Sequence, residues 1–209
     1  MAEPYVPIEA LPMIGGELCL DFANTTSERG LERPRERLFT YRDLVVWAER
    51  SGAIEPARAG VLRQEALARP ADAARVHARA LQLREALYRV FSALAHHEPP
   101  NSADVAWIDA EVREAQRRRR LIPAEDGVAW VWLSDEDALE EILWPVAWSA
   151  AELLTSDELT RVRECMGENC NWLFVDVSRN RSRRWCDMKE CGNRAKAKRY
   201  QARQRVVAR

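Results

Sequence analysis

Apolar residues recur at three- and four-residue steps through most of the first 160 positions, which is the spacing of helices that bury one face. The longest such run covers residues 71–97, and we predict that it forms the central helix of the core. Its apolar positions are Val76, Ala80, Leu83, Leu87, Val90, Phe91 and Leu94. Further helices are expected over residues 41–50, 56–69 and 102–117, because each run is preceded or opened by residues typical of helix starts.

Three other segments of this region have weaker patterns. Residues 17–25 fit both a strand and a helix face, and we favour a helix. Residues 121–133 predict a β-hairpin turned at residues 125–127, and a helix is expected over residues 135–154 with a kink at Pro145. Residues 26–39 are charged and lack an apolar period, so we expect a loop.

Few polar side chains in this helical region are candidates for a ligand-binding or catalytic site. Asp21 and Asn24 lie in an apolar segment, where a polar group without hydrogen bonds is costly. They either tie neighbouring loops together, which we favour, or contact a small-molecule effector. His96 and His97 lie at the end of a predicted helix, where interaction with the helix dipole accounts for them as well as a role as ligands does. The arginines of residues 117–120 are typical of an exposed strand edge that charged side chains protect from pairing. No nucleotide-binding glycine loop, G-x-S-x-G or H-E-x-x-H motif occurs, so we do not expect an enzyme.

Four of the five cysteines form two C-x4-C pairs, Cys165 with Cys170 and Cys186 with Cys191. Fifteen residues separate the pairs, enough for a β-hairpin, so four thiolates can converge on one tetrahedral ion. The odd count, which leaves Cys19 alone, favours metal over disulfides. We predict zinc rather than iron or an iron–sulfur cluster. Four thiolates leave no open coordination position, so the ion is expected to be structural.

The order of elements around the cysteines is similar to a treble-clef finger. Residues 172–177 predict a strand, residues 178–184 a basic arm, and residues 194–207 a helix that begins just after Cys191. We therefore expect a mainly α protein. A helical N-terminal domain with one β-hairpin would cover residues 1–158, and a small treble-clef-like zinc finger with four cysteine ligands would cover residues 159–209.

Charge is divided unevenly between these two parts. Residues 161–209 hold fourteen Lys or Arg and five Asp or Glu, a net charge of +9, which leaves −10 on residues 1–160. A basic appendage on an acidic body is typical of a protein that binds a polyanion. The candidate contacts are Arg179, Arg181, Arg183 and Arg184 in the arm, and Asn193, Arg194, Lys196, Lys198, Arg199, Arg203 and Arg205 in the helix.

Three kinds of binding partner are compatible with the sequence. DNA is favoured. RNA is the alternative, with Trp172, Phe174 and Trp185 as stacking surfaces if they are exposed. The third is an acidic protein partner, such as the body of another copy. No tract approaches 18 apolar residues and no signal peptide is visible, so we expect a cytoplasmic protein without a membrane partner.

Two stretches resemble known families. The run from Ser178 to Lys196, with Cys-Gly-Asn-Arg at residues 191–194, resembles the CGNR zinc finger, and residues 18–25 are similar to the opening of the ABATE-type domain that accompanies it. The resemblance implies a bacterial, stress-related transcription regulator whose finger binds DNA. The helical domain would then sense a ligand or mediate homodimerisation.

Overall fold

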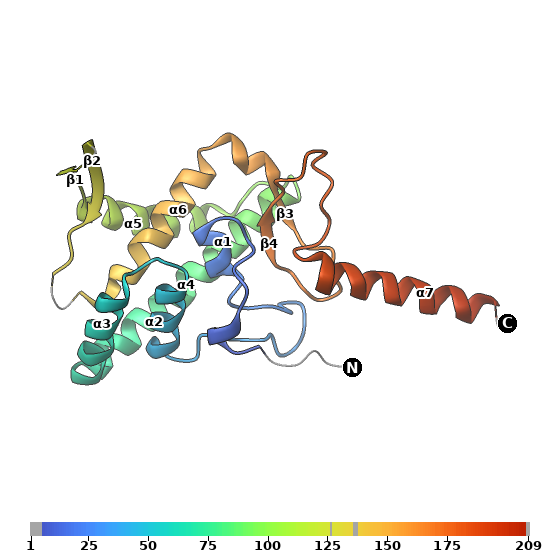
Figure 1. Ribbon diagram of the computed structural model, residues 1–209, viewed down its shortest axis with the longest axis horizontal. Helices are drawn as coiled ribbons and strands as arrows, with labels where there is room; N and C mark the ends of the chain where they lie inside the picture. The colour runs from blue at the N-terminus through green and yellow to red at the C-terminus, as the bar shows by residue number, and fades with distance from the viewer. Residues whose placement is uncertain (1–5, 126, 136–137, 208–209) are drawn as a thin grey trace.

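The computed structural model describes residues 6–125, 127–135 and 138–207, with side chains as far as residue 204. The chain is mainly helical, as predicted (Figure 1). In order, its α-helices and strands are α1 (Leu18–Ala23), α2 (Tyr41–Arg50), α3 (Pro56–Ala68), α4 (Pro70–Ala95), α5 (Ser102–Arg118), β1 (Arg119–Ala124), β2 (Gly127–Trp132), α6 (Leu143–Leu154), β3 (Val162–Glu164), β4 (Leu173–Val175) and α7 (Asn193–Val207). Short 3-10 helices cover Ile8–Ala10, Leu139–Ile142 and Asp157–Arg161, and one π-helical turn covers Met188–Gly192.

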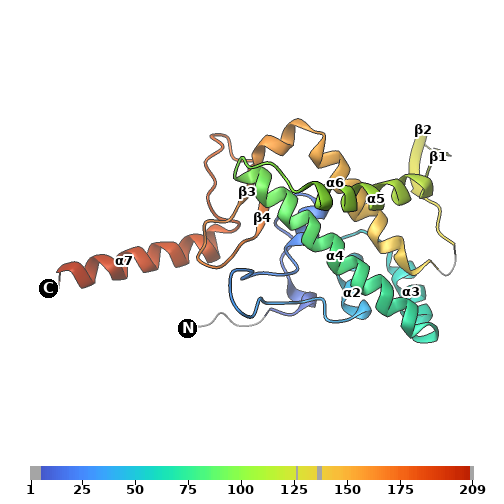
Figure 2. The ribbon, with the colours of Figure 1, turned by 180° about the vertical axis from the view of Figure 1, so that it is seen from behind.

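Helix α4 is the centre of the body, which confirms the expectation from its apolar period. It contacts α1, α2, α3 and α5, and also β3 and β4 of the C-terminal part. Leu83, Leu87 and Phe91 of its apolar stripe are fully buried, and Leu94 near its C-terminal end is partly buried. Figure 2 shows α4 running the length of the body, with β3 near its C-terminal end and α3 near its N-terminal end.

Local sequence sets the ends of α2 and α3. Thr40 accepts a hydrogen bond from the Asp43 amide, and the Asp43 carboxylate accepts one from the Thr40 amide, so α2 starts at a capping box. Pro56 is the first residue of α3, where no amide proton is needed. These two starts agree with the predicted boundaries.

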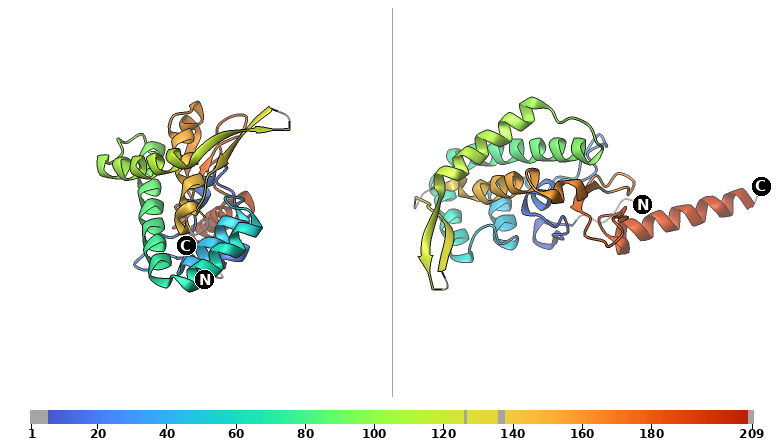
Figure 3. Two further views of the ribbon diagram at one scale, coloured as in Figure 1. Left: turned by 90° about the vertical axis from the view of Figure 1, so that its left-hand side faces the viewer. Right: turned by 90° about the horizontal axis from the view of Figure 1, so that it is seen from above.

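The predicted hairpin is present, with β1 and β2 antiparallel and Arg119 opposite Trp132. It projects from the body at the end opposite α7 (Figure 3). Its base is held by tryptophan contacts with α6, since Trp130 and Trp148 ring centroids lie 6.5 Å apart and the Arg119 guanidinium lies 4.0 Å from the Trp148 centroid. Arg119 is therefore engaged with aromatic rings rather than facing solvent.

The helix expected over residues 135–154 is shorter than predicted. A 3-10 helix covers Leu139–Ile142 and α6 begins only at Leu143; the capping residue Asp137 lies outside the described residues. The predicted kink at Pro145 is wrong. Pro145 is the third residue of α6, and amides in the first turn have no carbonyl partner to lose.

The C-terminal part packs on the body through β4. Leu173 and Phe174 are fully buried, and they belong to the same apolar core as α1 and α4. The Val175 amide donates to the Gly15 carbonyl at 2.8 Å, which adds a backbone contact between the two parts. Helix α7, in contrast, extends away from the body (Figure 1). Among the helices that the structure describes, none is both long and apolar enough to cross a membrane.

Candidate metal centre and nucleic-acid interface

The first cysteine pair lies in a turn between two short strands. Val162 of β3 pairs with Val175 of β4, and the Cys165 amide donates to the Trp172 carbonyl at 2.8 Å to extend the ladder. Asn169 and Asn171, on either side of Cys170, have left-handed φ angles of 61° and 58°, which asparagine tolerates well.

The position of this hairpin differs from the prediction. Its strands flank the first cysteine pair, whereas the sequence suggested a hairpin between the two pairs. Strand β4 pairs with β3, which comes before the first cysteine pair and whose Val162 is buried. The segment that follows β4 forms no strand in the described residues 176–187, so no hairpin lies between the two pairs. The strand itself covers Leu173–Val175 rather than residues 172–177.

The four cysteine sulfurs form one compact cluster, with all of their Sγ atoms within 4.8 Å of one another. The Cys186 sulfur lies 3.6 Å from that of Cys170 and 3.7 Å from that of Cys191. A tetrahedral ion with Zn–S bonds of about 2.3 Å would hold its sulfurs about 3.8 Å apart, whereas a disulfide needs about 2 Å. The cluster therefore fits a structural zinc ion that is held by Cys165, Cys170, Cys186 and Cys191.

Hydrogen bonds to sulfur prepare the cluster for a cation. The amides of Gly167 and Cys186 each donate to the Cys165 sulfur at 3.3 Å, and the Arg194 guanidinium donates to the Cys191 sulfur at 3.0 Å. The neighbouring thiols, Cys170 first, lower the pKa of Cys165, while Cys165 in turn raises the pKa of Cys170 and of Cys186. Four thiolates so close together need a divalent cation to balance their charge.

Gly167 is required by the close approach of the two halves of the site. A Cβ atom at this position would lie 2.9 Å from the Cys191 sulfur and 3.3 Å from the Cys165 sulfur. A zinc ion held by both sulfurs would fix their positions, so neither could move aside. Any larger residue here would separate the first pair from the second.

The basic arm and α7 meet beside the metal cluster at a groove of about 280 Å³, which we call the finger groove. It is lined by Met166, Glu168, Arg184, Trp185, Cys191, Arg194, Ala195, Lys198 and Arg199. The structure thus brings together four of the predicted nucleic-acid contacts, Arg184 from the arm and three cations from α7. Lys198 forms an ion pair of 2.5 Å with Glu168, and the Arg184 guanidinium lies 5.5 Å from the Trp185 ring centroid.

The other predicted contacts are distributed outside this groove. Arg179 and Arg181 are exposed at the tip of the arm, and Lys196 and Arg203 are exposed along α7. The Asn193 side chain donates to the Lys189 carbonyl at 2.9 Å, so it stabilises the start of α7. The side chain of Arg205 lies outside the described part of the chain.

Arg183 differs from its neighbours because it points into the finger. Its guanidinium lies 4.3 Å from the Phe174 ring centroid and donates to the carbonyls of Trp185 and Cys186. These contacts fix the arm against the second cysteine pair. In this arrangement Arg183 positions the arm rather than facing a partner.

Asp176 is a positioning residue that our reading of the sequence missed. It is fully buried and accepts hydrogen bonds of 2.9 Å from the amides of Ser178 and Arg183, which closes the base of the arm. Burial by itself would raise the pKa of Asp176, but the hydrogen bonds from Ser178 and Arg183 lower it below the usual value. The Asp-x-Ser pattern of an Asx turn was the available signal.

Asn24 and Asp21, the candidate ligand-binding residues of the body, form hydrogen bonds within the protein. The Asn24 side chain donates to the Leu173 carbonyl and accepts from the Leu173 amide, both at 2.8 Å, so it joins α1 to β4. Asp21 accepts from the Gly15 amide at 2.8 Å, and burial raises the pKa of Asp21 to about 6. These contacts match the favoured role of tying loops together.

The three histidines lie apart from the cysteine cluster. His77 Nε2 lies 2.9 Å from the Leu38 carbonyl, and His96 Nε2 lies 3.4 Å from a Glu164 oxygen. His97, two residues beyond the last residue of α4, has a left-handed φ of 60°. Within the described residues, the metal-binding group contains cysteines alone.

Two family models match this chain and together cover most of it. Residues 16–157 match the ABATE family, described as "putative stress-induced transcription regulator", and residues 161–204 match the CGNR zinc finger. The second match contains all four clustered cysteines. A search of the curated proteins finds no significant match.

Proposed function

Because the chain belongs to the ABATE family and carries a CGNR zinc finger, we propose that it is a transcription regulator that binds DNA through that finger. The resemblance noted in the sequence is thereby confirmed at the level of family. We further propose that the two parts of the chain have different roles. Residues 159–209 contact nucleic acid, while residues 1–158 sense an effector or form a homodimer, in a cytoplasmic protein that is not an enzyme.

The finger groove is the observation that carries this proposal. Arg184, Arg194, Lys198 and Arg199 come from two separate segments, and their relative positions are fixed through the cysteine cluster. A set of guanidinium and ammonium groups in fixed positions is suited to successive backbone phosphates. Zinc in this arrangement has a structural role and no catalytic one, because it holds the arm and α7 together.

The shape of α7 also suits duplex DNA. The helix contains six Lys or Arg and no Asp or Glu, and its 15 residues give a length of about 22 Å. It extends from the body without lying on the acidic surface of its own chain (Figure 1). A helix exposed in this way can enter a major groove, whose width of about 12 Å accepts one helix.

Salt dependence of binding tests the proposal. If four cations of the groove contact phosphates, the plot of log K against log salt should have a slope of about −3.6, measured by fluorescence anisotropy with a mixed-sequence duplex. Arg199→Ala should reduce the magnitude of that slope by about 1. The matched control is Arg113→Ala, an exposed arginine of α5 whose partner is Asp109, and it should leave the slope unchanged.

The same experiment identifies results that would contradict DNA binding. Absence of binding to the duplex and to sheared genomic fragments at low salt would refute the proposal. A slope that Arg199→Ala and Arg113→Ala change equally would show that binding follows net charge and not the finger groove. Sequencing the genomic fragments that the protein retains would then give the operator.

RNA is the second candidate, and one observation favours it. Trp185 is partly exposed in the finger groove next to Arg184, so an unpaired base could stack there. Trp172 and Phe174 were expected to offer stacking surfaces only if exposed, and both are buried in the shared core. Stronger retention of structured RNA than of DNA, lost in Trp185→Ala, would support this candidate over DNA.

A further inference from the structure

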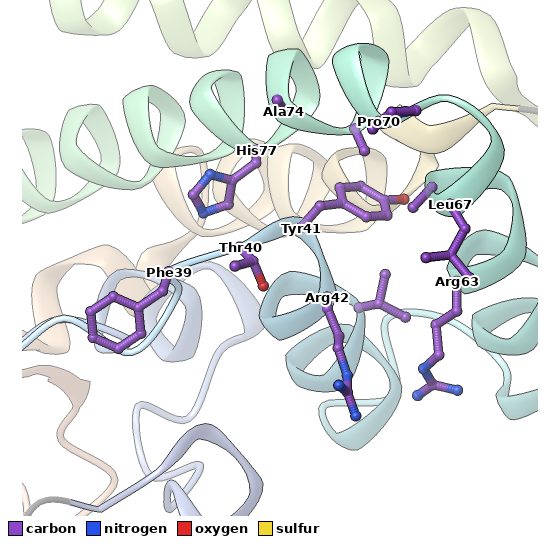
Figure 4. Close-up of a pocket in the computed structure, with 12 residues that line it drawn as sticks. Phe39, Thr40, Tyr41, Arg42, Arg63, Leu67, Pro70, Ala74 and His77 are labelled. Atoms are coloured by element: carbon purple, nitrogen blue, oxygen red, sulfur yellow. The ribbon is translucent and has the colours of Figure 1, made fainter.

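A pocket of about 590 Å³ opens on the body between α2, α3 and the N-terminal end of α4. Figure 4 shows Phe39 at one side of it, Leu67 at the other, and Ala74 and His77 above them on α4. This volume is within the range of sites for small organic ligands. The pocket is separate from the finger groove, and the two share no lining residue.

The walls of this pocket are mainly apolar, and part of that surface is exposed. Phe39 has 62 % of its surface exposed and Leu67 has 77 %, although both are large hydrophobic residues. Tyr41 also lines the pocket, and its hydroxyl donates to the Leu139 carbonyl at 2.8 Å. Covering these side chains with an apolar ligand would remove hydrophobic surface from water.

Positive charge lies on one side of the opening. The Arg42 and Arg63 side chains extend in the same direction in Figure 4. Arg63 pairs with Glu49, whereas Arg42 is exposed and forms no ion pair with any residue that the structure describes. The remaining polar groups have partners, since the Thr40 hydroxyl donates to Asp43 and His77 Nε2 lies 2.9 Å from the Leu38 carbonyl.

We propose that this pocket binds an amphipathic organic acid. The apolar portion of the ligand lies between Phe39 and Leu67, and its carboxylate faces Arg42. An unpaired guanidinium beside apolar walls favours a monoanion over a neutral or cationic molecule of the same length, because only the carboxylate forms an ion pair with it and an ammonium group is repelled.

Two elements join this pocket to the finger. Helix α4 is about 39 Å long by its 26 residues. His77 lines the pocket near its N-terminal end, while Ser92 near the other end donates to Glu164 of β3 at 2.6 Å. The segment of residues 26–39 also connects them, since the Glu28 amide donates to the Cys170 carbonyl at 3.4 Å and Phe39 lies in the pocket. A ligand-dependent change in DNA affinity rests on the proposed function; binding of the acid does not.

Calorimetry on the zinc-loaded full chain, without DNA, tests the pocket with three probes of equal length: decanoate, decan-1-ol and decylamine. We expect decanoate to bind up to about 5-fold more tightly than the other two, since an ion pair with an exposed guanidinium contributes up to about 1 kcal/mol. Arg42→Gln should remove this preference. Arg113→Gln, the same change on an exposed arginine of α5, should keep it.

A second variant distinguishes pocket binding from binding elsewhere on the surface. Ala74 is exposed within the pocket, so Ala74→Trp should fill the space and abolish decanoate binding without altering the buried core. Ala106→Trp is the matched control on the exposed face of α5. Equal affinity for all three probes, or decanoate binding that survives Ala74→Trp, would overturn the proposal.

Another occupant would give a different result. If a second copy covers this surface, sedimentation should show a dimer that Leu67→Glu dissociates, and decanoate should not bind; that outcome also overturns the proposal. Because no DNA is present in these measurements, failure of the pocket and failure of the finger groove are separately visible. Decanoate added to the DNA titration then reports whether the two sites are coupled.

Discussion

Asn24 is the residue whose replacement best tests how the finger is attached to the body. Its side chain makes two hydrogen bonds of 2.8 Å to the backbone of Leu173, a residue 149 positions away, and only 1 % of its surface is exposed. Asn24→Leu keeps a side chain of similar size and excludes water. The Leu173 amide and carbonyl would then be buried without partners.

The magnitude follows from those two backbone groups. Each buried and unpaired donor or acceptor costs about 1–3 kcal/mol. The gain from burying a leucine offsets part of this, and we expect the free energy of unfolding to fall by about 2–5 kcal/mol. Asn24→Asp should also destabilise the fold, because a carboxylate oxygen would face the Leu173 carbonyl and its charge would be buried.

Urea unfolding in excess zinc, followed by tryptophan fluorescence and circular dichroism, measures this change. Asn180→Leu is the control, since Asn180 is exposed in the arm and its replacement should change stability by no more than about 0.5 kcal/mol. A loss below about 1 kcal/mol in Asn24→Leu would show that the two hydrogen bonds do not hold the finger to the body.

Two further predictions concern pH and zinc. Burial raises the pKa of Asp21 in the folded protein to about 6 from its usual value of 3.8. The native state therefore binds a proton at Asp21 more readily than the unfolded state does. Asp21 should add to the free energy of unfolding as pH falls from about 7.5 towards 5. Asp21→Asn should flatten that part of the pH profile in urea unfolding; an unchanged profile would contradict the assignment. Gly167→Ala should weaken zinc binding in competition with a chromogenic chelator, because its Cβ would lie 2.9 Å from the Cys191 sulfur. Wild-type zinc affinity in this variant would show that the cluster tolerates the added atom.

Much of the metal centre could be predicted from the sequence because its information is local. Cysteine spacing alone identified the ligand set. Thr40 and Asn101 marked helix starts because their side chains accept hydrogen bonds from nearby backbone amides, and Pro56 marked the first turn of α3. The hairpin of β1 and β2 was visible for the same reason. Local rules failed at Pro145, where the true start of α6 depends on contacts that a pattern of residues does not show.

The candidate nucleic-acid interface was predictable only as a collection of charges. Fourteen basic residues follow position 160, but the sequence did not show which of them meet. Folding places Arg184 beside Arg194, Lys198 and Arg199, and directs Arg183 into the finger against Phe174. The arm is closed by Asp176, whose role depends on burial.

The sequence by itself determined the helical class, the four ligands and the basic character of the last 49 residues, because periodicity, thiol chemistry and charge are properties of residue type and spacing. Only the tertiary structure decided that the finger shares a core with the body. Asn24 and Leu173 are 149 residues apart, and their hydrogen bonds exist only once α1 and β4 are packed together. The pocket beside Arg42 likewise arises from three helices, so no local pattern could indicate it.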